Sequence, residues 1–139
     1  MSMPEAVFHR PSSVPLPRRV LVRVVVGAAR LLATQSPRRI RRVLGFLHRG
    51  AEPATFEQVR AARDAVTAVS LTCAAREGCV ARSLATILLC RLRGRWASWS
   101  VGARRIPPFG AHAWVEVGGI PVGEDEYPPD YFRTFFTVR

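Results

Sequence analysis

The chain has 139 residues, which fits one domain, and 48% of them are hydrophobic, which excludes a disordered chain and allows a buried core. Its 21 basic residues are all Arg and outnumber the 10 acidic residues, giving a formal net charge of +11. A surplus of this size favours an anionic partner, such as a nucleic acid, a membrane surface or an acidic peptide.

The cysteines indicate a reducing compartment, so we expect a cytoplasmic protein. Cys73, Cys79 and Cys90 form no CxxC pair and the histidines are scattered, which argues against a disulfide framework and against a metal site such as zinc. The N-terminus lacks the pattern of a secretory signal. The most apolar stretch, Val20–Ala33, is too short to span a bilayer and contains two arginines.

The chain divides into an arm and one domain. Residues 1–17 contain four prolines and predict a flexible N-terminal arm, followed by a single domain over residues 18–139. Within that domain we expect a basic helical part over residues 18–75, and a helix with a small sheet over residues 76–139.

Helices are predicted through the first part of the domain. Apolar residues at helical spacing predict one helix over residues 18–35, and a second over residues 38–49 that starts after Ser36-Pro37. Thr55 and Gln58 have the spacing of a capping box, which predicts a third helix that continues to residue 75.

The second part changes from helical to alternating periodicity. Residues 79–93 give the clearest helix pattern, and alternation predicts strands near residues 98–103 and over residues 111–117. Gly118-Gly119 predicts a turn to a returning strand at residues 120–122, and the aromatic tail over residues 127–139 is expected to pack on the domain. Helices followed by a small antiparallel sheet predict an α+β fold.

Cys79 is a candidate nucleophile because it follows Gly78 at the start of a predicted helix. The positive end of the helix dipole lowers the pKa of a thiol in that position, which favours the reactive thiolate. The backbone N–H groups of the first turn, that of Cys79 included, can also hold a developing oxyanion.

His112 is the one histidine in a regular strand pattern, and an imidazole near the thiol acts as base and then as acid. An acid after the turn would orient it, and the hairpin register decides which one. A three-residue loop at residues 117–119 places Glu124 opposite His112. A two-residue Gly118-Gly119 loop pairs Val117 with Ile120 and places Asp125 there instead.

Several short motifs of the sequence resemble those of the lasso peptide biosynthesis leader peptidase family. The most specific are Gly-Cys-Val-Ala-Arg-Ser-Leu-Ala at residues 78–85 and Pro-Phe-Gly-Ala-His-Ala-Trp-Val-Glu-Val at residues 108–117. Pro-Val-Gly-Glu at residues 121–124 and Tyr-Phe-Arg-Thr-Phe-Phe-Thr-Val at residues 131–138 also fit. The resemblance covers about residues 15–139. It is most specific because the motif around Cys79 and the motif around His112 both occur in the same chain.

The resemblance implies a transglutaminase-like fold, also described as papain-like, and a cysteine peptidase that needs no cofactor. Such a peptidase removes the leader from a ribosomally made lasso precursor before an ATP-dependent cyclase forms the macrolactam. The family's nucleophile maps onto Cys79, its base onto His112 and its acid onto Glu124, with Asp125 as the neighbouring alternative. The short form lacks a leader-recognition domain, so we expect a small separate recognition protein.

Other residues are assigned supporting or docking roles. Arg82 lies one helical turn after Cys79, where it can support the site or a substrate carbonyl, or form a surface salt bridge. Trp114 shares the strand face of His112 and is expected to form a wall. The basic helix can present a docking surface for the partners. Its arginines are Arg38, Arg39, Arg41 and Arg42.

Three other functions remain open from the sequence. A non-catalytic scaffold would recruit precursor to the cyclase through the basic helices. A nucleic-acid binder is suggested by charge alone, and the chain lacks an interleaved aromatic platform, so we expect no nucleic-acid partner. Acyl transfer to an amine in place of water would use the same site chemistry as the peptidase.

Overall fold

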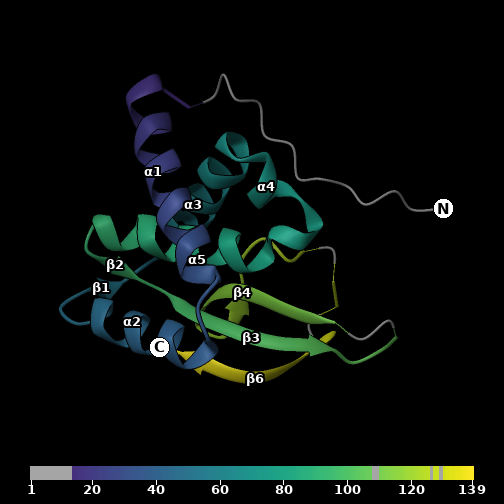
Figure 1. The fold of residues 1–139 in the computed structure, drawn as a ribbon. Helices are drawn as coiled ribbons and strands as arrows, with labels where there is room; N and C mark the ends of the chain where they lie inside the picture. Colours follow the sequence, from purple (N-terminus) through teal and green to yellow (C-terminus); the bar gives the residue numbers. More distant parts are fainter. Residues whose placement is uncertain (1–13, 108–109, 126, 129) are drawn as a thin grey trace.

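The computed structural model describes residues 14–107, 110–125, 127–128 and 130–139. Helices cover one face of an antiparallel sheet (Figure 1). The helices are α1 (Leu16–Ala33), α2 (Pro37–Leu47), α3 (Phe56–Val69), α4 (Leu71–Ala74) and α5 (Cys79–Leu92), with a 3₁₀ turn η2 at Arg76–Gly78. The strands are β1 (Glu52–Pro53), β2 (Arg95–Trp96), β3 (Ser98–Arg104), β4 (Ala111–Val117), β5 (Ile120–Pro121) and β6 (Phe132–Val138).

The predicted starts of α2 and α3 agree with the structure because capping side chains fix them. The Ser36 hydroxyl accepts the backbone N–H of Arg39, and Pro37 opens α2. Thr55 and Gln58 form the expected reciprocal capping box at the start of α3. Helix α1 begins at Leu16, inside the predicted arm, and residues 1–13 of that arm lie outside the described residues.

The third predicted helix is interrupted, contrary to the expectation that it continues to residue 75. Ser70 has an extended backbone, with φ −120° and ψ 111°, and its hydroxyl accepts the backbone N–H of Cys73. This cap ends α3 and starts α4. The resulting break directs the chain into η2 and so to the start of α5.

The sheet has the order β5-β4-β3-β6, and all its pairings are antiparallel. The C-terminal tail packs on the domain as predicted. It does so as strand β6, which pairs along β3 with a register shift between Val101 and Gly102. A short parallel pair, β1–β2, was not predicted. Helix α5 packs on β4 and is itself contacted by α1 and α3, so it lies at the centre of the fold. The mixed α+β architecture agrees with the sequence prediction.

Candidate active site

Cys79 is the first residue of α5 and is 9% exposed. Gly78 precedes it, and a Cβ on Gly78 would collide with the backbone carbonyl oxygen of Thr72. Only glycine therefore allows η2 to pass this close to α4. Because Gly78 offers no capping side chain, the first-turn backbone amides of α5 lie beside the thiol without a side-chain cap.

His112 lies on β4 and contacts the carboxylate of Glu124. The His112 Nε2 atom is 3.2 Å from the Glu124 Oε2 atom, and the two side chains are 13% and 7% exposed. When the imidazole is protonated, this contact is an ion pair. Since Nε2 faces Glu124, the other ring nitrogen, Nδ1, is the one left to face the thiol.

The two reactive groups shift each other's pKa. Burial raises the pKa of Cys79, but a hydrogen bond with His112, the backbone N–H of Ala113 and the charges of His112 and Arg82 lower it to a net value below 9.0. Burial lowers the pKa of His112, yet hydrogen bonding and charge from Cys79 and Glu124 raise it to about 9. Both shifts act in the direction of a thiolate and imidazolium pair.

The hairpin has the two-residue loop, with Val117 paired to Ile120 and positive φ at Gly118 and Gly119. That register was expected to bring Asp125 to His112, and this expectation is wrong. Strand β5 ends at Pro121, and Gly123 has φ +76°, so the chain leaves the ladder before the acids. Asp125 instead forms an exposed ion pair with Arg60 at 3.0 Å.

Aromatic rings pack against the imidazole of His112. Phe132 stacks on the imidazole with ring centroids 4.6 Å apart, and Trp114 stacks at 5.9 Å. Phe132 belongs to β6, where it pairs with Arg104 of β3, and Gly102 of β3 pairs with His112. A Cβ on Gly102 would collide with the carbonyl oxygen of Arg133 and lie 3.0 Å from Trp114. The sequence reasoning missed Gly102 and Phe132 as parts of this wall.

Two buried arginines lie next to the site. The guanidinium of Arg82 donates to the carbonyl oxygens of Cys73 at 3.0 Å and Ala75 at 3.3 Å, so it fixes the chain that precedes Cys79. Arg63 of α3 packs its guanidinium against Gly123, the residue before Glu124. Burial, together with the charge of Arg82, lowers the pKa of Arg63, and the charge of Glu124 acts in the opposite direction. The sequence analysis did not predict a role for Arg63, whose burial depends on packing between α3 and the segment at Gly123.

A groove of about 420 Å³ adjoins the acid side of the site. Trp114, Phe132 and Tyr127 form its aromatic wall, and Glu116, Glu124 and Asp125 supply its carboxylates. The Oε2 atom of Glu116 accepts the indole N–H of Trp114 at 3.1 Å, which fixes the orientation of that ring. The groove has room for a side chain of a bound peptide.

The predicted docking arginines lie on α2, which is far in the sequence from the residues that line this groove. All four are exposed. The guanidinium of Arg41 also lies 4.7 Å from the centre of the Phe136 ring, and Arg39 donates to the side chain of Gln35 at 3.0 Å. Among the described residues, no helix combines the length and apolar character needed to cross a bilayer, and no group of three metal-ligating side chains occurs.

Comparison with known families matches residues 22–137 to the transglutaminase-like superfamily. No curated protein and no solved structure matches the chain. The matched range includes Cys79, His112 and Glu124.

Proposed function

The chain belongs to the transglutaminase-like superfamily, and from this premise we propose that it is a cysteine peptidase that removes the leader from a lasso peptide precursor. Proteins with this fold are commonly cysteine peptidases or transferases. The observation that carries the proposal is the connected series of Cys79 at a helix N-terminus, His112 on the adjacent strand and Glu124 against the far side of its ring.

In the proposed reaction the Cys79 thiolate attacks the carbonyl carbon of the scissile peptide bond. The backbone N–H of Cys79, at the positive end of α5, stabilises the oxyanion that forms. His112 then donates its proton to the leaving amine, which becomes the free N-terminus of the core peptide. Water, deprotonated by His112, hydrolyses the thioester and releases the leader. Glu124 orients the imidazole and stabilises its charged form.

The lasso precursor is proposed as the substrate because the motifs around Cys79 and His112 resemble those of that peptidase family. The proposal includes a separate leader-recognition protein and an ATP-dependent cyclase as partners, all acting in the cytoplasm. The arginines of α2, all of them exposed, are proposed as the docking surface.

Reconstituted cleavage tests this function. Precursor, recognition protein and the enzyme are combined, and the masses of the released leader and core are measured by mass spectrometry. We expect cleavage by the native chain and by the Cys90→Ala control, and none by Cys79→Ala. Cleavage by Cys79→Ala would overturn the proposal and favour a non-catalytic scaffold. A product joined to an amine, in place of the free acid, would indicate acyl transfer.

A further inference from the structure

Helix α3 carries a charged residue on the face that packs into the core. Arg63 is 8% exposed and lies one helical turn from Val59 and from Val66, both of which are fully buried. The proposed peptidase mechanism gives this side chain no role. A buried guanidinium is costly unless an anion lies close to it, so Arg63 needs a counter-charge.

The segment that contains Glu124 packs over this guanidinium. Gly123 has a positive φ and lies so close to Arg63 that a Cβ on it would overlap the guanidinium. Arg63 and Glu124 line one cavity of about 10 Å³, which is too small for a substrate side chain. Burial lowers the pKa of Arg63 and the charge of Arg82 adds to this, whereas the charge of Glu124 raises it. The carboxylate of Glu124 is therefore a counter-charge for Arg63.

Two arginines of α3 match the two consecutive acids of this segment. Arg60 lies three residues before Arg63 and forms the exposed ion pair with Asp125 at 3.0 Å. Arg63 is the buried member of the pair and lies beside Glu124, which is buried as well. The same helix thus presents a buried cation and an exposed cation, each beside its own acid, and Arg60 is a matched control for Arg63.

Arg82, the second cation that lines this cavity, is engaged elsewhere. Its guanidinium donates to the carbonyl oxygens of Cys73 and Ala75. Among the described residues of the lining, Glu124 is the only acid. Arg63 is therefore the cation whose packing is directed at the segment of Glu124.

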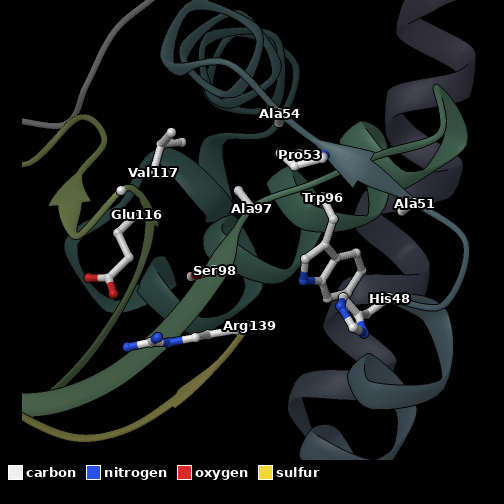
Figure 2. Close-up of a pocket in the computed structure, with 11 residues that line it drawn as sticks. His48, Ala51, Pro53, Ala54, Trp96, Ala97, Ser98, Glu116, Val117 and Arg139 are labelled. Atoms are coloured by element: carbon white, nitrogen blue, oxygen red, sulfur yellow. The ribbon is translucent and has the colours of Figure 1, made fainter.

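The charged residues of another cavity are arranged differently. Glu116 and Arg139 both line the pocket of about 240 Å³ shown in Figure 2, so their opposite charges offset each other there. Arg139 is exposed, and solvent screens a charge in that position. The buried charge of Arg63 is screened much less, so it acts more strongly on its neighbours.

Glu124 needs a counter-charge that does not vary during catalysis. In the proposed reaction His112 is charged before it donates its proton to the leaving amine, and it is neutral afterwards. The side chain of Glu124 is 7% exposed, so its carboxylate loses a buried ion pair whenever His112 becomes neutral. An arginine side chain keeps its charge throughout, so Arg63 supplies a positive charge at that stage.

We propose that Arg63 is a positioning residue that acts through Glu124, as the permanent counter-cation of this carboxylate. It keeps Glu124 ionised while His112 is neutral. It also makes the proton of His112 easier to release, because the carboxylate is already partly neutralised. The proposal rests on the proposed function in taking His112 as the proton donor. It is tested without substrate, so a failed cleavage assay and a failed titration would be separate results.

The test is a pH titration of His112 by heteronuclear NMR, in a Cys79→Ala background that removes the coupling to the thiol. The other titratable and charged groups stay in place, namely Tyr127 beside the imidazole and Arg82, Asp64 and Arg60 around Arg63. We expect Arg63→Gln to move the titration midpoint of His112 to higher pH, since Glu124 then depends more on the imidazolium. Arg60→Gln should leave the midpoint unchanged. Arg63→Lys keeps the charge, so its midpoint should stay close to that of the parent.

Three results would overturn the proposal. The first is an unchanged or lower midpoint in Arg63→Gln. The second is an Arg63→Lys variant that titrates like Arg63→Gln, because the guanidinium would then act through packing and not through charge. The third comes from adding Arg63→Gln to Glu124→Gln, which should move the midpoint less than it does when Glu124 is present. An equal movement would show that Arg63 acts on His112 directly.

A second variant tests the proposal even if Arg63→Gln does not fold. In His112→Gln a neutral amide replaces the imidazole, and Arg63 is retained. The NMR signal of the Glu124 carboxyl carbon at neutral pH should then be that of a carboxylate. The signal of a protonated acid would show that Arg63 does not keep Glu124 ionised, and this would overturn the proposal.

Discussion

The carboxylate of Glu124 contacts the His112 ring at 3.2 Å, although its neighbour Asp125 is the acid that an extended hairpin register places opposite His112. The difference arises at Gly123, where the positive φ turns the chain out of the ladder. Consequently one acid is buried against the imidazole, and the next is exposed and paired with Arg60.

Substitution of the two acids should therefore have unequal effects. Glu124→Gln should lower kcat/KM for precursor cleavage by roughly 10²–10⁴-fold, because the imidazolium loses its orienting charge. Asp125→Asn, the matched control, should lower it less than about threefold, since an exposed ion pair contributes little. A larger loss from Asp125→Asn than from Glu124→Gln would reverse the assignment of the acid.

The pH dependence of kcat/KM should be bell-shaped. Activity needs the Cys79 thiolate, so the acid limb should lie below the ordinary thiol value of 9.0. It also needs protonated His112, whose pKa is raised to about 9, so the alkaline limb should lie near that value. Glu124 raises the pKa of His112, so in Glu124→Gln the alkaline limb should move to lower pH. An alkaline limb that does not move would contradict this coupling.

Gly102 should tolerate no side chain. In Gly102→Ala the added methyl group meets the Arg133 carbonyl oxygen and the Trp114 ring, so the free energy of unfolding should fall by about 2 kcal/mol. Denaturant titration measures this change. Gly45→Ala on α2 meets no atom within 4 Å and should leave stability unchanged or raise it slightly. Equal stability of the two variants would show that the close packing over β3 is unimportant.

Charge reversal on α2 tests the proposed docking surface. The double variant Arg38→Glu/Arg42→Glu should raise the KM for the precursor, measured with the recognition protein present, and leave kcat nearly unchanged. The reason is that both residues are exposed and lie far in the sequence from the catalytic residues. The matched control is Arg105→Glu. If the double variant and the control behave alike, α2 is not the docking surface.

Local signals predicted more of this structure than long-range ones. Ser36, Thr55 and Gln58 specify helix starts through contacts within a few residues, so those starts could be predicted. The pairing of β6 with β3 joins residues 28 to 39 positions apart and includes a bulge that hides the alternation, so the tail was not predicted as a strand. The candidate triad was found from residue types and order, whereas its aromatic wall depends on the small size of Gly102.

The most direct test of the central claim is to trap the acyl-enzyme. The enzyme is mixed with precursor and recognition protein, and the reaction is quenched with acid within the first turnover. The mass of the intact protein is measured by mass spectrometry, and peptide mapping then locates any adduct. The account predicts an added mass equal to the leader less one water, carried as a thioester on Cys79 and released by hydroxylamine, with none in Cys79→Ala and an unchanged adduct in Cys90→Ala. Cleavage that proceeds without any adduct on Cys79, or with the adduct on Cys73 or Cys90, would contradict it.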